Sequence, residues 1–455
     1  MSINRRNKHA GRHAEGMAHH VAVSKSLRNS TYILIIAAMA VIALFAINTH
    51  VGSPASQNQS ISHGVSPVQP QNASYAYIFN AGDGYITAIN ALSNTPSRIL
   101  AVGSLDSAGH DMVPVNNGRI YVLNTFPSNY STATTPVPPG YISVANLSSG
   151  HISKIITGSL LPISIATYPK GARAYVLYVY VPNGNIVVNG YVAVINTTTD
   201  NVTHILPVGK EVFWRTVDQG IAVSPNGASV YVSNYKSNSV DVINTTTYRI
   251  TSTIPTNGPG PIVLNQKLPY AYVLDGLGYN ITVINTTTDT VSKKILIDEP
   301  PLSLVSNSKG TMLYVIGSKV DDSNGILVSI NATTNNIYRI AATGTNPTAL
   351  VLSPDGSTLY VSNEGSLSGT PSTGTVSVIN STSLITYKSI DVGTEPKALA
   401  YTPYGDIYVV NFSPGAALDQ SPAGNVSVIN TSTLRVVKTI TVGHQPNAII
   451  VLNQT

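Results

Sequence analysis

The chain has 455 residues, of which 10% are charged and none is cysteine, so disulfides, thiolate metal sites and cysteine nucleophiles are excluded. Its formal net charge of +5 comes from residues 1–30, whereas the rest of the chain carries equal numbers of basic and acidic residues. A protein that binds nucleic acid normally shows a clustered basic surface. The balance of charge after residue 30 therefore argues against nucleic acid as a partner.

Residues 31–48 form an uncharged apolar segment directly after the basic residues 1–30. Eighteen residues are enough, at the short end, for a helix that spans a bilayer. Because the positive charge lies before this segment, we expect residues 1–30 to stay in the cytoplasm and the chain after residue 48 to lie outside the cell. The predicted location is the cell membrane, with a single-pass anchor. The alternative is secretion after cleavage of a signal peptide near Ser53 and Ala55.

Residues 49–74 are rich in Ser, Gln, Pro and Asn and contain few large apolar side chains. This composition is typical of a flexible polar linker. Residues 75–455 are expected to form a single large domain, because one repeated pattern runs through them.

The repeated pattern is a short phrase that reads VINTTT in three copies and takes closely related forms in five others. Its asparagines lie 41 to 56 residues apart and are Asn90, Asn146, Asn196, Asn244, Asn285, Asn331, Asn380 and Asn430. A period of this length, built from short apolar stretches, is typical of a propeller or another repeat array.

One unit of the repeat is clearest between Asn346 and Ile390. Residues 347–353 are apolar and end at a Pro-Asp-Gly turn, and residues 358–362 and 374–380 alternate apolar and polar side chains. A fourth alternating stretch, residues 384–392, leads into the next unit. Four short strands make one antiparallel sheet, which cannot bury both faces alone. The sheets must therefore stack around an axis, as propeller blades do.

Several motifs in a fixed order carry a family resemblance. They are SPNG followed by VYVSN (224–234), SPDG followed by LYVSN (353–363), the VINT phrases, and a V-G-x-x-P connector at 392–396 and 442–446. With these motifs the chain resembles the YVTN-family β-propeller repeat of archaeal and bacterial surface proteins, including surface-layer types. The resemblance covers roughly residues 75 to 455. It implies an all-β propeller displayed at a cell surface.

The ends of the domain predict how the ring closes. The domain starts with a strand of the second type, Tyr75–Phe79, and ends with a strand of the first type, Asn447–Leu452. If the last strand completes the first blade, eight four-stranded blades result and few strand edges stay open. We predict eight blades; the alternative is seven, if the divergent first unit packs differently.

Meander topology assigns the loops to two faces. The turns after the first and third strands of each blade lie on one face, here called the turn face. The loops after the second strand and the connectors between blades lie on the other, the connector face. The longer and more variable loops belong to the connector face. Because binding residues collect on loops held by a rigid scaffold, we expect recognition there.

Four residues of the connectors are candidates for ligand contacts: Trp214, Arg215, Glu395 and His444. Trp214 beside Arg215 suits stacking on a sugar or anchoring a partner. The alternative is that Trp214 only fills a gap between blades. Asp321, Asp322 and Asn324 form a weak calcium candidate, because they offer hard oxygen ligands without the full EF-hand spacing, and an acidic turn is the simpler interpretation.

The repeated asparagines also form N-x-S/T acceptors, which are glycosylated in exported chains. These candidates are Asn146, Asn196, Asn244, Asn285, Asn331, Asn380 and Asn430. Asn, Ser and Thr also favour turns through local hydrogen bonds, which is the competing explanation for the repeat.

Catalytic motifs are not evident. The histidines of the repeat domain lie in different units, and no spacing singles out a pair of carboxylates.

We expect an extracellular module that binds a cell-surface protein or glycan, or forms part of a surface coat. We expect no cofactor. The alternatives are an extracellular enzyme of the lactonase or lyase type with its site at the axial channel, and a sensor that signals through the tail. The oligomeric state stays open. The scarcity of carboxylates predicts tolerance of acidic surroundings.

Overall fold

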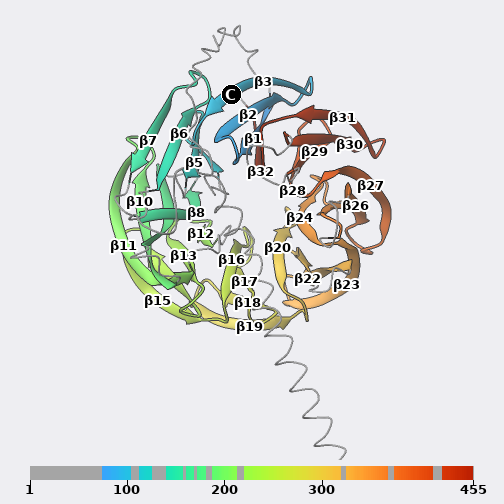
Figure 1. Cartoon of the computed structure of the whole chain (residues 1–455). Helices are drawn as coiled ribbons and strands as arrows, with labels where there is room; N and C mark the ends of the chain where they lie inside the picture. The colour runs from blue at the N-terminus through green and yellow to red at the C-terminus, as the bar shows by residue number, and fades with distance from the viewer. Residues whose placement is uncertain are drawn as a thin grey trace, which may run out of the picture. The chain divides into compact units, whose positions relative to one another are not determined.

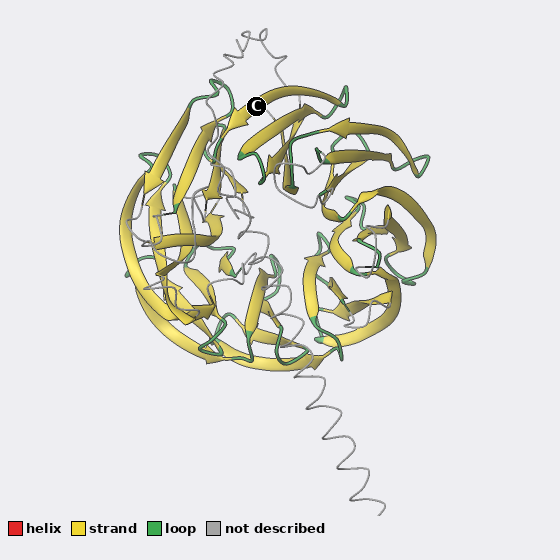
Figure 2. Cartoon of the chain, in the orientation of Figure 1, coloured by secondary structure: helices red, strands yellow, loops and turns green. Residues whose placement is uncertain are grey.

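In the computed structural model the described residues are 74–103, 112–124, 140–156, 160–168, 172–180, 187–212, 220–318, 324–366, 373–412 and 423–453. They form strands and turns only (Figure 2). Among them no helix has the length and apolar character needed to cross a membrane. The predicted anchor at residues 31–48 lies outside the described residues, as do the tail and most of the linker.

The strands form eight four-stranded antiparallel sheets, which are the blades. Blade 1 contains β32 (Pro446–Asn453), β1 (Ser74–Asn80), β2 (Tyr85–Asn90) and β3 (Thr95–Ala101). Blade 2 contains β4 (Met112–Val115), β5 (Arg119–Asn124), β6 (Tyr141–Asn146) and β7 (Ile152–Ile156). Blade 3 contains β8 (Leu160–Tyr168), β9 (Arg173–Tyr180), β10 (Val187–Asn196) and β11 (Asn201–Val212). Blade 4 contains β12 (Ile221–Val223), β13 (Ser229–Asn234), β14 (Ser239–Asn244) and β15 (Arg249–Pro255).

The other four blades repeat the same order. Blade 5 contains β16 (Pro259–Leu264), β17 (Tyr270–Asp275), β18 (Asn280–Asn285) and β19 (Thr290–Leu296). Blade 6 contains β20 (Pro301–Ser306), β21 (Met312–Gly317), β22 (Asn324–Asn331) and β23 (Asn336–Thr345). Blade 7 contains β24 (Pro347–Leu352), β25 (Thr358–Asn363), β26 (Thr373–Asn380) and β27 (Thr386–Thr394). Blade 8 contains β28 (Pro396–Tyr401), β29 (Asp406–Asn411), β30 (Asn425–Asn430) and β31 (Arg435–Thr441).

The blades follow one another around a ring, and the last strand joins the first (Figure 1). β32 pairs with β1 from Ser74↔Asn453 to Asn80↔Pro446. The predicted eight blades and the closure by the C-terminal strand are confirmed, and the seven-blade alternative is wrong. Closure satisfies the backbone groups along the inner edge of blade 1, which would otherwise be open for pairing with another chain.

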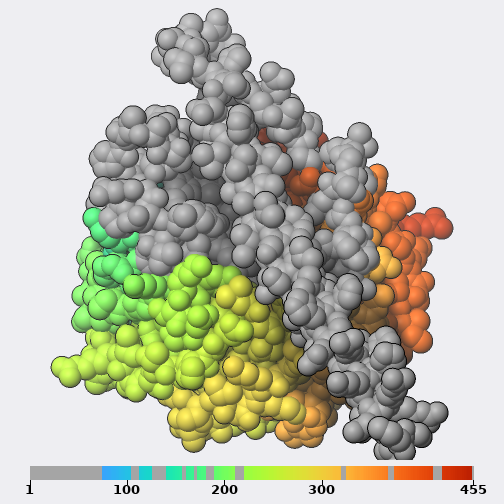
Figure 3. All heavy atoms as spheres, turned by 60° about the horizontal axis from the view of Figure 1, so that its bottom comes forward, coloured from blue at the N-terminus to red at the C-terminus, as the bar shows by residue number. Residues whose placement is uncertain are grey.

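The hydrophobic core is divided among the blade interfaces. Each of eight clusters of buried side chains draws on two neighbouring blades. The alternating pattern of each inner strand sends one set of side chains to the preceding blade and the other to the following blade. The outermost strands are more exposed: β19 of blade 5 and β23 of blade 6 each have a single buried position, and this part of the chain is the yellow to orange surface in Figure 3.

A tyrosine in the second strand of several blades reaches across the interface to the next blade. Tyr231 donates its hydroxyl hydrogen to Asp289 Oδ1 at 2.7 Å, and Tyr272 donates to Asn335 Oδ1 at 2.9 Å. Tyr408 of blade 8 bonds to Asn94 of blade 1, across the closure. Each acceptor is the last residue of the turn after a third strand and has a positive φ, which Asn and Asp tolerate best. Burial raises the pKa of Tyr231, so the hydroxyl remains a donor.

Replacing Tyr231 with phenylalanine is expected to lower the free energy of unfolding by about 1–3 kcal/mol, because Asp289 then loses a charge-assisted hydrogen bond. The measurement is the midpoint of urea unfolding at unchanged slope. The matched control is Tyr360→Phe, since the Tyr360 hydroxyl makes no hydrogen bond to another residue in the described part of the chain. Equal shifts in the two variants would contradict the role of the bond.

The connector motif is explained by close packing between blades. A Cβ atom on Gly393 would lie 2.7 Å from the side chain of Asn411, which ends the second strand of the next blade and is fully buried. Gly209, Gly344 and Gly443 face Asn234, Asn363 and Asn80 in the same way. Glycine in the connector therefore matches the asparagine that ends the second strand. This packing holds these four connectors beside the loop that follows the second strand of the next blade.

Candidate functional site

The structure describes only some of the candidate residues. Glu395, His444 and Asn324 are described, whereas Trp214, Arg215, Asp321 and Asp322 lie outside the described residues. Asn324 begins β22, and its Oδ1 accepts a hydrogen bond from Thr345 Oγ1 at 3.3 Å. Within the part of the chain that the structure describes, no group of three His, Asp or Glu side chains is placed to hold a metal ion.

His444 and Asp83 form a pair where the ring closes. His444 Nδ1 lies 2.7 Å from Asp83 Oδ1, and the His444 backbone N–H donates to Asp83 Oδ2 at 2.6 Å. His444 lies in the connector before β32, and Asp83 lies in the loop between β1 and β2. Two bonds to one carboxylate fix both the backbone and the ring, and they orient Nδ1 toward the acid. An imidazole held in this way can exchange a proton through Nε2.

The neighbouring contacts show why this pair forms. Gly443 N donates to Asn80 Oδ1 at 3.0 Å, and Gly82 N donates to the carbonyl of His444 at 3.1 Å. In blade 4 the equivalent contact is made by Lys210 N, which donates to Ser237 Oγ at 2.7 Å. A polar side chain at this loop position therefore clamps the connector. In blade 1 that side chain is an acid beside a histidine, so the clamp also carries a titratable pair.

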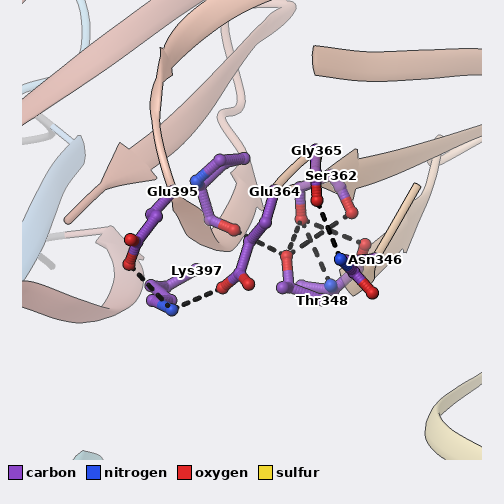
Figure 4. Close-up of polar contacts among 9 residues, drawn as sticks. Asn346, Thr348, Ser362, Glu364, Gly365, Glu395 and Lys397 are labelled. Carbon is purple, nitrogen blue, oxygen red and sulfur yellow. Dashed lines mark hydrogen bonds and ion pairs between the residues drawn. The ribbon is translucent and has the colours of Figure 1, made fainter. Parts of the chain in front are cut away.

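A second charged cluster lies between blades 7 and 8 on the same face. Lys397 Nζ contacts Glu364 Oε1 and lies 3.4 Å from Glu395 Oε2, so the ammonium sits between two carboxylates (Figure 4). The same Nζ lies 5.3 Å from the centre of the Phe412 ring, within the range of a cation–π contact. With two acids and one base the cluster carries a net negative charge.

The cluster is positioned by backbone hydrogen bonds. Phe412 N donates to the carbonyl of Glu395 at 3.1 Å, and Glu364 N donates to the carbonyl of Asn346 at 2.9 Å. Glu395 has a φ of 47°, and Asn346 has a φ of 49° at the corresponding place before the proline of its connector. The repeated connector geometry thus holds Glu395 and Lys397 in place. The Asp83–His444 pair and this cluster are two groups of interacting charges on the connector face.

Sequence reasoning placed Glu395 and His444 on this face and missed three partners. Asp83 and Glu364 were not singled out because each lies in a loop far in the sequence from the connector residue that it contacts, and Lys397, two residues after Glu395, was not singled out either. Asp83 and His444 are separated by 361 residues in the sequence. The available signal was the meander itself, which puts the loop after each second strand beside the following connector.

Sequence reasoning also missed two adjoining cavities on the turn face. They have volumes of about 200 Å³ and 470 Å³, lie at the interfaces of blades 2, 3 and 4, and share Tyr168 and Arg173. The available signal was local. Blade 3 has Tyr168 where blades 4 and 7 have the serine of SPNG or SPDG, and Tyr248 follows the NTTT phrase of blade 4 where blades 3 and 5 have aspartate.

The repeated asparagines make the turns of that face. The Oδ1 atom of Asn244 accepts hydrogen bonds from the N–H groups of Thr246 and Thr247, both at 2.9 Å. Asn146, Asn196, Asn331 and Asn380 make the same two contacts. The turn-forming explanation of the repeat is therefore confirmed. Glycosylation of Asn146, Asn196, Asn244, Asn285, Asn331, Asn380 and Asn430 stays a prediction.

The eight four-stranded blades, closed by β32, define the chain as an eight-bladed β-propeller. Neither a protein-family model nor a curated protein sequence matches it. Among solved structures it is similar to the dihydro-heme d1 dehydrogenase NirN in complex with DHE, at 11% identity and a TM-score of 0.62, over 83% of this chain and 74% of NirN. It is also similar to AztD from Citrobacter koseri, at 11% identity and a TM-score of 0.54, over 85% and 99%.

A third similar structure is a putative 6-phosphogluconolactonase from Bacteroides fragilis, at 13% identity and a TM-score of 0.52, over 85% of this chain and 100% of the other. At these identities the similarity establishes the propeller fold alone, because one fold supports many unrelated activities.

Proposed function

We propose that this chain is a membrane-anchored propeller at the cell surface that binds a surface protein or glycan, either as an adhesion module or as part of a surface coat. The observation that carries the proposal is the connector face of the closed ring. There Lys397 is held between Glu364 and Glu395, and Asp83 is held against His444. Charged groups fixed in advance favour selective recognition, because little conformational entropy is lost on binding.

The N-terminal part of the sequence supports the location. The apolar residues 31–48 follow a basic tail, and seven turn-face asparagines form N-x-S/T acceptors. The motifs of residues 75–455 resemble the YVTN repeat of surface proteins. We also propose that the chain belongs to that group and that the asparagines of the turn face are glycosylated.

A second candidate function is an extracellular hydrolase, favoured by the 2.7 Å contact between His444 Nδ1 and Asp83 Oδ1. A solved structure with the same fold, from Pseudomonas aeruginosa, is described as a periplasmic gluconolactonase. An oriented imidazole could act there as a general base. If this candidate function is right, the protein hydrolyses gluconolactone faster than the uncatalysed reaction. This activity is then lost in His444→Gln and kept in Lys397→Met.

The deciding experiment for the main proposal is protease shaving of intact cells that produce the full chain. Released and retained peptides, including glycopeptides, are identified by mass spectrometry. We expect release of peptides from residues 75–455, glycans on the VINTTT asparagines, and protection of residues 1–30. A cytoplasmic protein of the same cells is the control for lysis. Propeller peptides that appear only after lysis, without glycans, would overturn the surface location.

A further inference from the structure

The two turn-face cavities form a site that is separate from the connector face. The larger one is lined by Tyr168, Ala172, Arg173, Tyr175, Asn196, Thr203, His204, Gly227 and Tyr248. The smaller one adjoins it through Tyr168 and Arg173. Among the described residues, no aspartate or glutamate lines either cavity. Arg173 lines both cavities and is an exposed residue.

The preceding blade interface shows the partner that an arginine has at the same position of blade 2. Arg119 of blade 2 stands two residues before Tyr121, as Arg173 of blade 3 stands two residues before Tyr175. Arg119 Nη1 lies 2.6 Å from Asp200 Oδ2, and the Tyr121 hydroxyl donates to Asp200 Oδ1. Arginine and tyrosine of one blade thus share a carboxylate from the turn of the next blade.

The equivalent carboxylate is missing between blades 3 and 4. Tyr248 occupies the place of Asp200 and has nearly the same backbone conformation, with φ of 53° against 57°. Arg173 keeps the contact to the turn, because its Nη1 donates to the carbonyl of Thr245 at 3.1 Å, as Arg119 donates to the carbonyl of Thr197. None of the ion pairs between described residues involves Arg173. Instead its guanidinium lies 5.6 Å from the centre of the Tyr248 ring.

Aromatic rings and hydroxyl or amide groups surround this arginine. Tyr248 stacks on His204 with ring centres 3.8 Å apart and an angle of 24° between the planes. The Tyr168 ring lies against Gly227, where a Cβ atom would be 2.7 Å from the ring. Asn196 and Thr203 add an amide and a hydroxyl to the lining. Flat aromatic surfaces with a few polar groups suit a ligand that has one apolar side and many hydroxyls.

We propose that this cavity binds a carboxylated saccharide, such as a uronic acid residue of a glycan. Its carboxylate pairs with the guanidinium of Arg173, which also contacts the hydroxyl of Tyr175, and so supplies the charge that Asp200 supplies at the preceding interface. The planar guanidinium matches a carboxylate in two parallel hydrogen bonds, which also fixes its orientation. The sugar ring packs against Tyr168 and Tyr248, and its hydroxyls face Asn196 and Thr203.

The test is calorimetric titration of the full-length protein with sodium glucuronate, glucose and sodium acetate at low and moderate salt. Glucuronate is expected to bind at least about tenfold more tightly than glucose, because only the acid meets Arg173. It is also expected to bind at least about tenfold more tightly than acetate, because only the sugar meets the rings. Equal binding of acetate and glucuronate, or no binding of glucuronate, would overturn the proposal.

Variants locate the site and separate binding from folding. Arg173→Gln is expected to weaken glucuronate binding at least about tenfold. The matched control is Arg339→Gln, because Arg339 also lies over a tyrosine ring, at 5.2 Å from the centre of Tyr338, and lines neither cavity. Unchanged binding in Arg173→Gln, or equal loss in both variants, contradicts the assigned site.

Tyr248→Asp supplies a carboxylate from the protein itself. It recreates the arrangement of Arg119 with Asp200, so glucuronate binding is expected to disappear while the thermal midpoint is kept or raised. Tyr248→Asn removes the same ring without adding a charge and is expected to keep part of the binding. If Tyr248→Asp binds glucuronate as well as Tyr248→Asn does, the carboxylate does not occupy this position. A failure of these tests leaves the connector-face proposal unaffected, because that proposal rests on other residues.

Discussion

A chain that ends at Val442 is expected to lose cooperative folding. The truncation removes β32, the innermost strand of blade 1, together with Gly443 and His444. It leaves the inner edge of β1 without its seven paired residues and removes Ala448, Ile450 and Leu452 from the cluster shared by blades 1 and 2. An open edge beside an exposed apolar face favours association with other chains.

The measurement is urea unfolding followed by circular dichroism, together with size-exclusion chromatography. A chain that ends at Asn453 keeps every residue of β32 and serves as the control. A synthetic peptide of residues 443–453, added to the truncated chain, is expected to restore a single sharp transition by adding the missing strand. A truncated chain that unfolds as sharply as the control, at the same midpoint, shows that closure contributes little to stability.

Replacing Asp275 with asparagine is expected to stabilise the protein at neutral pH by up to about 3 kcal/mol. Asp275 is fully buried at the end of β17, and its Oδ1 has no hydrogen-bond partner among the described residues. Burial raises the pKa of this carboxyl to about 6; the hydrogen bond from Thr282, the charge of Lys294 and a hydrogen bond from the backbone of Asn257 oppose the shift only in part. Five other blades place asparagine here: Asn80, Asn124, Asn234, Asn363 and Asn411.

The sign of the pH dependence follows from the raised pKa. The folded state holds the proton of Asp275 up to about pH 6, whereas the unfolded chain releases it near the ordinary value of 3.8. The contribution to stability is therefore fully present below about pH 4 and is lost as the pH rises through about 6. This direction agrees with the tolerance of acid that the scarcity of carboxylates predicts.

The measurement is the urea midpoint of the protein and of Asp275→Asn between pH 4 and pH 7.5. The gain in stability is expected at neutral pH and should shrink toward zero near pH 4. Thr282 can accept from the new amide, as Thr87 Oγ1 accepts from Asn80 Nδ2 at 2.9 Å. Asp391→Asn, at an exposed position of β27, is the control. A gain that is the same at both ends of the pH range would contradict the buried, protonated carboxyl.

Several features of the fold could be predicted from the sequence because they depend on local patterns. Alternation of apolar and polar residues, turn residues such as Pro354-Asp355-Gly356, and the count of strand types lead to eight blades and to closure by the C-terminal strand. The repeated Asn followed by Ser or Thr indicates a turn, since its hydrogen bonds reach only two or three residues along the chain.

The candidate sites could be predicted only in part. Glu395 and His444 were placed on the connector face by topology, but their partners Glu364, Lys397 and Asp83 belong to other loops and strands. The anchor and Trp214 lie outside the described residues, so their roles stay predictions.

The sequence by itself determined the number of blades, the strands of each blade and the face on which each loop lies, because period and turn chemistry are local. Only the tertiary structure decided which side chains meet across the blade interfaces: Asp83 with His444, Tyr231 with Asp289, and Arg173 with a tyrosine instead of an acid. These contacts depend on the closing of the ring and on the packing of one blade against the next. That packing joins residues tens to hundreds of positions apart, and no local pattern encodes it.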